Sequence, residues 1–534
     1  MKQIVVLSGP IAVGKTAFSD ELMRRYPCEK VSTRNYILRV KQVSDERKAL
    51  QQAGAELDME TNGSWVADAV SVGMSDTSKS FLLVDSARIA GQVRALRDRF
   101  GADNVHHFHL TAPHDVLERR YRERAGVGDQ VATYTEAKAD VIEAEVDKLA
   151  AIADVVVQTE KSDVPSCVTF ATAGRISVAA TPPSYVDLFV GGQWGSEGKG
   201  NICALLAPEY DVLVRVGGPN AGHKVKMPEY TYRQLPSGTG SNPKAEICIA
   251  AGSTISLEIL LKEIDDHGWL KKGGLLIDPQ AMIIEERDRE IEEKLLDGIS
   301  STKQGVGSAA ARKILGRDGE LEWGPPVRLA RDVDALHSYI GNVSQRIEQA
   351  LASGKKVMLE GTQGTELSIH HGSYPYVTSR ETSAAGCLSD AGIPFTKLRR
   401  VIVVTRTYPI RVGGKSGPMG VEISFEDIAQ RSGLPIEQIG TTELGSVSGK
   451  SRRMAEFDWE RMRRSVYWNG ATDIALTFVD YLGAENVAAV DFDDLNLEAK
   501  TFIVDLERIC GVPVSLISKG FGRDGLIDKR NWND

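Results

Sequence analysis

Short apolar runs alternate with longer amphipathic stretches along most of the chain. The apolar runs lie at residues 3–8, 81–86, 105–110, 153–158, 186–191, 211–216, 246–252, 355–361 and 399–406. Helix-like stretches such as AFSDELMRRY at 17–26 lie between them. Strands that alternate with helices are typical of parallel sheets whose faces are covered by helices. The pattern therefore predicts an α/β fold class with parallel sheets.

One stretch interrupts this alternation. Between Glu160 and Tyr185 the helical periodicity is lost and small residues and prolines accumulate, after which a new strand and glycine-rich turn begin. Linkers between domains have this composition. We expect two domains, residues 1–180 and 184–534. Each opens with a strand, a glycine-rich turn and a helix, but the loop spacings differ, so two distinct nucleotide-handling domains are expected rather than a repeat.

Composition and charge exclude several partners. The 534 residues are 42% hydrophobic and 26% charged, with a net charge of −9. No stripe of Lys and Arg is present, so polymeric nucleic acid is not an expected partner. No apolar stretch reaches the roughly 18 to 20 residues that span a membrane. Because the chain starts with an apolar run that enters a glycine-rich loop instead of a signal peptide, a cytoplasmic location is expected.

The first domain carries a phosphate-binding loop. Gly9-Pro-Ile-Ala-Val-Gly14-Lys15-Thr16 matches G-x-x-x-x-G-K-[ST] and lies between a strand and an amphipathic helix, as the motif requires. Gly9 and Gly14 let backbone amides surround phosphates, Lys15 supplies charge to the transferred group, and the Thr16 hydroxyl is a ligand for Mg²⁺. The motif predicts binding of ATP and Mg²⁺.

Further residues extend this site towards phosphoryl transfer. Asp85 ends an apolar run, where phosphate-loop enzymes place a carboxylate beside the metal. Arg34, Arg88 and Arg120 are candidates for neutralising phosphate charge, although solvated strand ends and helix faces carry the same residue types. The first domain resembles small nucleoside- or nucleotide-kinase-like phosphate-loop proteins. This resemblance implies phosphoryl transfer to a small acceptor.

The second domain opens with another glycine-rich loop. The strand VDLFV at 186–190 leads into GGQWGSEGKG around Lys199, and the next strand leads into GGPNAGHKV, which contains His223. A histidine that follows a parallel strand stands where open α/β sheets carry out chemistry. Imidazole also transfers protons near pH 7. These residues predict a second phosphate cradle with an acid–base histidine.

The two motifs resemble the hallmarks of the adenylosuccinate synthetase family, and later blocks follow in the family's order. Those blocks are LEGTQGT at 359–365, HGSYPYVTS at 371–379, RVG at 411–413, VSGKSRR at 447–453 and SKGFGR at 518–523. The resemblance implies a C–N ligase and the family's α/β fold for this domain. In that reaction a nucleoside triphosphate phosphorylates the 6-oxygen of a purine nucleoside monophosphate, and the amine of L-aspartate displaces the phosphate.

The resemblance also implies site residues. His223 would act as the acid towards the 6-oxygen, Lys199 would hold phosphates during catalysis, and Gly222 would offer its carbonyl to Mg²⁺. The residues implied to grip aspartate are Ser448, Gly449, Lys450 and Arg452. The other implied nucleotide contacts are Gly195, Glu197, Gly198, Gly200, Asn220, Thr302, Gln304, Gln363, Thr378, Val412, Asp480, Ser518 and Gly520.

One departure from the family pattern bears on the substrate. Ser196 stands where the family has its catalytic, Mg²⁺-binding aspartate. The shorter side chain leaves room for a 2-amino group and favours dGMP. The same replacement resembles the phage-type branch of the family, 2-amino-2′-deoxyadenylosuccinate synthetase. Two alternatives stay open: an ordinary synthetase acting on IMP, and a nucleotide-binding regulator or defence protein without turnover.

Three smaller departures concern the other ligands and the partner subunit. Lys450 replaces an arginine that reaches the ribose, which favours a deoxynucleotide. The family's T-K-L-D is T-F-V-D here; Asp480 can still accept from guanine, and the choice between ATP and GTP stays open. The family also implies a homodimer in which an arginine reaches the partner's nucleotide. Arg312 and Arg317 are the candidates, and the residue count favours Arg317.

Overall fold

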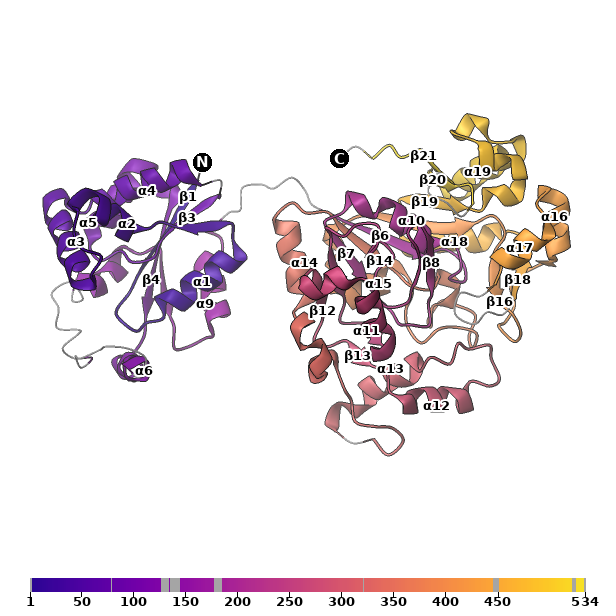
Figure 1. Cartoon of the computed structure of the whole chain (residues 1–534), viewed down its shortest axis with the longest axis horizontal. Coiled ribbons are helices and arrows are strands. Elements are labelled where there is room, and N and C mark those ends of the chain that lie inside the picture. Colours follow the sequence, from indigo (N-terminus) through magenta and orange to yellow (C-terminus); the bar gives the residue numbers. More distant parts are fainter. Residues whose placement is uncertain are drawn as a thin grey trace. The chain divides into compact units, whose positions relative to one another are not determined.

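The computed structural model describes residues 2–77, 79–125, 134, 145–176, 185–319, 321–444, 451–520 and 525–532. The chain divides into two compact units, Met1–Thr181 (unit 1) and Pro182–Asp534 (unit 2), and each is considered by itself (Figure 1). Among the described residues, no helix has both the length and the apolar character to cross a membrane.

Unit 1 is a five-stranded parallel sheet between two layers of helices. Its strand order is β2 (Cys28–Lys30), β3 (Phe81–Val84), β1 (Gln3–Ser8), β4 (Val105–Thr111) and β5 (Val155–Gln158). Side chains alternate along β1, so Ile4 and Val6 pack under one layer while Val5 and Leu7 pack under the other.

The helices of unit 1 divide between the two faces of this sheet. Helices α1 (Lys15–Arg25) and α9 (Val164–Thr172) pack together on one face, and α4 (Trp65–Asp76) and α5 (Ala90–Phe100) pack together on the other (Figure 1). The remaining described helices are α2 (Thr33–Lys41), α3 (Arg47–Thr61) and α6 (His114–Ala125).

Unit 2 is built on a nine-stranded sheet. The order is β12 (Leu275–Ile277), β10 (Glu246–Ile249), β7 (Val212–Arg215), β14 (Val357–Glu360), β6 (Val186–Gly191), β15 (Leu398–Arg406), β19 (Asp473–Thr477), β20 (Val514–Ser518) and β21 (Leu526–Asp528). All neighbouring pairs are parallel except β20 with β21. The carboxyl ends of the parallel strands therefore share one edge.

Helices and small sheets complete unit 2. The helices are α10 (Lys199–Leu206), α11 (Leu257–Asp266), α12 (Glu286–Leu295), α13 (Val306–Leu315), α14 (Val343–Ala352), α15 (Ala384–Ala391), α16 (Phe425–Ser432), α17 (Ile436–Thr442), α18 (Trp459–Asn469) and α19 (Leu497–Cys510). The small sheets pair β8 (His223–Lys226) with β9 (Glu229–Tyr232), β11 (Thr254–Ile255) with β13 (Met282–Ile283), and β18 (Arg452–Ala455) with both β16 (Ile410–Val412) and β17 (Glu422–Ile423).

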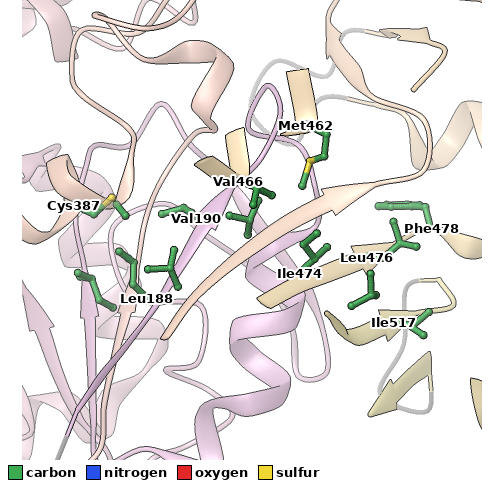
Figure 2. Close-up of a cluster of buried hydrophobic side chains, with 14 of the residues drawn as sticks. Leu188, Val190, Cys387, Met462, Val466, Ile474, Leu476, Phe478 and Ile517 are labelled. Carbon is green, nitrogen blue, oxygen red and sulfur yellow. The ribbon is translucent and has the colours of Figure 1, made fainter. Parts of the chain in front are cut away.

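A buried apolar cluster fixes the central strands of unit 2. Leu188 and Val190 of β6 and Ile474 and Leu476 of β19 pack in it (Figure 2). Helices α18 and α15 cover them with Met462, Val466 and Cys387 (Figure 2). Burial of this kind stabilises by about 1.5 to 3 kcal/mol per large side chain, so the strand ends that carry the site rest on a rigid base.

The predicted α/β class is confirmed, and every predicted apolar run contains a strand. Several strands end before the run does. The run at 81–86 leaves the sheet after Val84, and the run at 246–252 leaves it after Ile249, because Ala250 to Gly252 turn away. The extra residues in each run belong to loops at the carboxyl edge.

Candidate active site

A cavity of about 680 Å³ opens at the carboxyl edge of the parallel strands in unit 2. Its walls come from the loops that follow β6, β7 and β14, together with α12, α13 and β16. Sites for small molecules occupy this position in open α/β sheets and have this size. The sequence-predicted residues that line it are Gly195, Ser196, Asn220, Gly222, Thr302, Gln363, Thr378, Val412 and Arg452.

The glycine-rich loop after β6 is braced from inside. Gly198 has φ +82° and stands directly before the first residue of α10. Glu197 Oε1 accepts from the amides of Gln193 and Gly195 at 3.0 and 2.7 Å. The carboxylate that the sequence assigned to nucleotide binding therefore shapes its own loop. This leaves the loop and the N-terminus of α10 as the anion-binding feature.

Lys199 is buried at the first turn of α10. Its Nζ donates to the carbonyl of Gln363 at 2.9 Å and lies 3.4 Å from Glu197 Oε2. These contacts hold the ammonium group beside the cavity wall formed by Gln363. Gly200, the next residue, is required by packing: a Cβ there would lie 2.6 Å from the Cβ of His223.

His223 begins β8 and belongs to a buried polar cluster. Its Nδ1 contacts Glu360 Oε1 directly. Glu360 Oε2 accepts from the amide of Ser237 at 2.7 Å, and Arg215 Nη1 lies 3.5 Å from Oε1. Because a carboxylate only accepts, the proton on the histidine ring is at Nδ1. His223 Nε2 is buried and has no hydrogen-bond partner among the described residues. His223 itself is not part of the cavity lining but directly follows Gly222, which is.

The electrostatics of this pair set its protonation. Burial and then Arg215 lower the pKa of His223 to about 4, against the attraction of Glu360. Burial alone would raise the pKa of Glu360, but His223, Arg215 and Ser237 bring it to about 2. Without substrate the histidine is therefore neutral at pH 7 and Glu360 is ionised. A negative charge brought near Nε2 by a substrate favours the imidazolium.

Glu360, Ser237 and Arg215 were missed in the sequence analysis. Glu360 and Arg215 are the last residues of adjacent strands β14 and β7 and are partners in the strand register. A signal was present, since each strand ends in a charged residue followed by a glycine-containing loop. The sequence could not show that β14 and β7 are neighbours.

The loop after β14 faces the loop after β7. Gln363 Nε2 donates to Asn220 Oδ1 at 3.0 Å, and Thr362 Oγ1 donates to Gln363 Oε1 at 2.8 Å. These contacts fix the carboxamide at the cavity wall. Ser196 borders the same cavity, and its carbonyl lies 3.5 Å from Arg406 Nη1. The arrangement is suited to reading the edge of a planar heterocycle.

A second group of predicted residues comes together after β19 and β20. Asp480 lies in the 3₁₀ turn Val479–Leu482. A Cβ on Gly520 would lie 3.4 Å from Asp480 Oδ2, and Ser518 Oγ donates to the carbonyl of Gly520 at 3.0 Å. Asp480 Oδ1 is buried and has no hydrogen-bond partner among the described residues. Burial raises the pKa of this carboxyl to about 7.

The two candidate arginines have different environments: Arg312 lies on α13 and Arg317 lies just after it. Arg312 is completely buried, forms an ion pair with Asp288 at 2.7 Å and donates to the carbonyls of Pro326 and Ile283. Its side chain is held inside unit 2, which favours Arg317 as the candidate. Arg317 lies in the 3₁₀ turn Gly316–Asp318 and is exposed.

Some of the residues predicted to bind substrates either do not line the cavity or lie outside the described residues. Gln304 does not line it and accepts from Arg233 Nη2. Ser448, Gly449 and Lys450 lie outside the described residues. Leu444 and Ser451, which flank them, form a β-bridge, and Arg452 reaches the cavity wall.

In unit 1 the phosphate loop and Asp85 share one sheet edge, because β1 and β3 are adjacent and parallel. Gly14 has φ +101° and precedes α1, and Lys15 Nζ donates to the loop carbonyl of Pro10 at 3.0 Å. Thr16 is exposed at the first turn. Asp85 is paired with Lys30.

The predicted arginines of unit 1 have different environments. Arg34 forms an exposed ion pair with Asp45. Arg120 donates to Thr159 Oγ1 at 2.9 Å and to the carbonyl of Val13 in the phosphate loop at 3.4 Å. Arg88 is half-buried in the loop after β3, three residues after Asp85, and its amide donates to Gln92 Oε1 at 2.8 Å. Only Arg120 therefore contacts the phosphate loop directly.

The donor sets fit magnesium held together with phosphates. Within the described ranges, no group of three or more His, Cys, Asp or Glu side chains is arranged to hold a metal. The available ligands are oxygens: Thr16 and Asp85 in unit 1, and the carbonyl of Gly222 at the cavity of unit 2. Mg²⁺ prefers such ligands and usually completes its shell with phosphate and water.

Comparison with known proteins identifies a family and relatives that are similar to this chain. A family model described as adenylosuccinate synthetase matches residues 188–321 and 327–490. The adenylosuccinate synthetase of Methanocaldococcus jannaschii is 38% identical over 353 residues, which are 64% of this chain and 96% of that protein. The enzyme of Thermococcus sibiricus is 38% identical over 357 residues, covering 65% of this chain and 99% of that protein.

Two solved structures are also similar. Fully ligated adenylosuccinate synthetase from Plasmodium falciparum aligns with a TM-score of 0.56 at 24% identity and covers 65% of this chain and 100% of that one. The succinoaminodeoxyadenylate synthetase of cyanophage S-2L, bound to dGMP and to dATP as an energy donor, aligns with a TM-score of 0.53 at 28% identity. It covers 65% of this chain and 96% of that one.

Proposed function

The chain belongs to the adenylosuccinate synthetase family and is a ligase that joins aspartate to a purine nucleotide, and we propose that its preferred nucleotide is dGMP. The observation that carries the proposal is Ser196, a short side chain at the wall of the cavity beside Asn220, Gly222 and Gln363. A serine leaves space for the 2-amino group of guanine where a longer acid would stand. The cyanophage enzyme bound to dGMP supports the same choice.

The proposed reaction has the two steps that the family resemblance implies. The γ-phosphoryl group moves to the 6-oxygen of the purine while N1 releases its proton to water, which converts that oxygen into a leaving group. The aspartate amine then attacks C6, the C6–oxygen bond breaks, phosphate leaves, and the amine releases a proton to water. Lys199 and the loop amides hold phosphate charge. The phosphates favour the imidazolium form of His223, whose Nε2 then donates its proton to the oxygen that leaves with phosphate. Mg²⁺, when bound, would neutralise phosphate charge beside Gly222.

Unit 1 is proposed to add a kinase activity. Its support is the phosphate loop of Lys15 and Thr16 at the same sheet edge as Asp85, with Arg120 against the loop. This arrangement is suited to ATP with Mg²⁺ and to phosphoryl transfer to a small acceptor. A cytoplasmic location remains a prediction from the sequence.

Turnover is tested by phosphate release. With dGMP, aspartate, Mg²⁺ and either ATP or GTP, we expect aspartate-dependent phosphate release and a product whose mass corresponds to dGMP plus aspartate minus water. A protein that binds nucleotides but releases no phosphate with dGMP, GMP, dIMP or IMP would be a regulator without turnover. The curated relatives named adenylosuccinate synthetase keep IMP as the second candidate substrate.

Asp480 gives a pH prediction for the triphosphate. Guanine offers two N–H donors, which only the ionised carboxylate accepts in full, and the pKa of Asp480 is about 7. Because the ionised fraction of a group with that pKa rises about tenfold from pH 6 to pH 8, the KM for GTP is expected to fall by up to about tenfold over this range. Initial rates with GTP varied at each pH measure it.

The matched variant for this prediction is Asp480→Asn, which cannot ionise. Its KM for GTP should be higher and should not change between pH 6 and pH 8. A KM that is independent of pH in the unmodified protein, or that rises with pH, would show that Asp480 does not read guanine.

The synthetase unit is proposed to work as a homodimer, with Arg317 reaching the partner's nucleotide. Support comes from Ile314 and Leu315, the apolar side chains at the end of α13 directly before Arg317, which are each 60% exposed or more. Apolar side chains gathered in this way mark an interaction surface. A closed two-fold dimer would bring each Arg317 to the other chain.

Subunit mixing tests this arrangement. His223→Asn and Arg317→Ala are each expected to be inactive alone, and after subunit exchange the mixture should regain up to about a quarter of normal activity, since half of the dimers are mixed and each has one intact site. Arg312→Ala is the contrasting variant: it leaves Asp288 buried without its ion-pair partner and should lower stability by about 3 to 5 kcal/mol. No recovery despite proven exchange would exclude a shared site.

A further inference from the structure

A buried ionic cluster lies behind the cavity wall, at the point where Arg452 lines it. Glu443, directly after α17, is completely buried. Its Oε1 lies 2.5 Å from Arg406 Nη2, and its Oε2 lies 3.5 Å from Arg452 Nη1. Tyr481 Oη donates to the same Oε1 at 2.8 Å. One carboxylate is thus in contact with two guanidinium groups and a phenol.

The cluster ties together three parts of the site. Arg406 ends the central strand β15, and its Nη1 lies 3.5 Å from the carbonyl of Ser196 in the glycine-rich loop. Its guanidinium also covers the ring of Phe478 at 3.9 Å, at the end of β19 (Figure 2). Glu443 is therefore anchored, through Arg406, to the phosphate-binding side of the cavity.

The backbone of Glu443 also holds the chain on either side of the predicted aspartate loop. The amide of Arg452 donates to the carbonyl of Glu443 at 3.1 Å, and Leu444 and Ser451 are bridged. Both ends of the stretch 445–450 are thus held side by side. Arg452 begins β18 two residues after this stretch, and it is the member of the cluster that belongs to the cavity lining.

The charges in this contact set do not cancel. Arg406 and Arg452 carry two positive charges against the single negative charge of Glu443, in a region shielded from water. Buried charges are costly unless they are paired. Arg406 faces Glu443 with both terminal nitrogens, at 2.5 and 3.3 Å, whereas Arg452 approaches it with one at 3.5 Å. Arg452, which has the weaker hold on Glu443, is also the guanidinium of this pair that belongs to a residue of the cavity lining.

We propose that Glu443 is a positioning residue for the amino-acid substrate: it fixes the Arg452 guanidinium at the cavity wall so that this group meets a carboxylate of the incoming aspartate. The inference rests on the proposed function, in which aspartate is the attacking amine. Arg452 is then aligned before the substrate arrives, so less side-chain freedom is lost on binding. The guanidinium nitrogens of Arg452 that do not contact Glu443 belong to a rigid planar group, which pairs with a carboxylate.

The experiment is a steady-state comparison of Glu443→Gln with the unmodified protein, varying each substrate separately. The glutamine keeps the shape and removes the charge that holds Arg452. We expect the KM for aspartate to rise at least about tenfold, while the KM values for the purine nucleotide and the triphosphate change less than about twofold. Glu456→Gln is the matched control, because it removes a carboxylate from an exposed ion pair with Arg431 and should change none of the three.

Tyr481→Phe covers the case in which Glu443→Gln does not fold. It removes one hydrogen bond to Glu443 without changing a charge, and the aspartate KM should rise about twofold to fivefold with the other two unchanged. If whichever variant folds raises all three KM values together, or lowers only kcat, the cluster is structural and the inference is wrong. An unmodified protein that never incorporates aspartate would instead refute the proposed function.

Discussion

Replacing His223 with asparagine is expected to lower the rate of succinyl-nucleotide formation by about 10²-fold or more, the usual contribution of a general acid. Asparagine occupies similar space but cannot carry a transferable proton. The Nε2 atom of His223 is buried and has no partner in the part of the chain that the structure describes, and the Glu360 carboxylate stabilises the imidazolium from the other side of the ring. Single-turnover rates with saturating substrates measure the effect.

Lys15→Ala is the control that separates the two units. It removes the ammonium group from the phosphate loop of unit 1, so triphosphate binding or phosphoryl transfer there should be lost. Synthetase turnover should remain within about twofold of normal, because Lys199 belongs to a separate glycine-rich loop in unit 2. If Lys15→Ala abolished succinyl-nucleotide formation in a folded protein, the two sites would be coupled.

Ser196→Asp is expected to lower kcat/KM for dGMP at least about tenfold, while use of IMP is maintained or improved. The aspartate adds bulk where the 2-amino group of guanine is proposed to lie, and discrimination by one methylene-sized group is worth about 10- to 200-fold. Parallel measurements of kcat/KM for dGMP and IMP give the result.

Two further substitutions at position 196 show whether the size or the charge of the side chain determines the use of dGMP. Ser196→Ala keeps the space and should retain the preference for dGMP. Ser196→Asn has the size of aspartate without its charge and should impair dGMP as strongly as Ser196→Asp does. A Ser196→Asn protein that uses dGMP normally would mean that charge, and not space, governs the choice.

The sequence predicted the parts of the molecule that depend on local pattern. The strand runs, the phosphate loop of Lys15 and the α/β class follow from hydrophobic spacing and glycine placement, which neighbouring residues determine. The choice between Arg312 and Arg317 was also accessible in part. The residue count favoured Arg317, and the structure agrees with that preference because Ala309 and Arg312, three residues apart, share the buried face of α13.

Contacts between distant residues were beyond the sequence. Glu360 meets His223 across 137 positions, because β14 is inserted beside β7 in the sheet. Glu443 and Arg406 are brought together from α17 and β15, and a glutamate at the end of a helix normally faces solvent. Glu197, assigned to the nucleotide from the motif, turns back to its own loop amides. These outcomes depend on strand order and loop closure, which no local pattern encodes.

The most direct test of the central claim is a competition in one vessel. Equal concentrations of dGMP and IMP, both below saturation, are supplied to the unmodified protein with aspartate, Mg²⁺, ATP and GTP, and the two succinylated products are counted by mass at early times. The account predicts at least about ten succinylated dGMP molecules for each one formed from IMP, because a pocket with space and partners for the 2-amino group leaves polar groups unpaired without it. A product ratio in favour of IMP would contradict it.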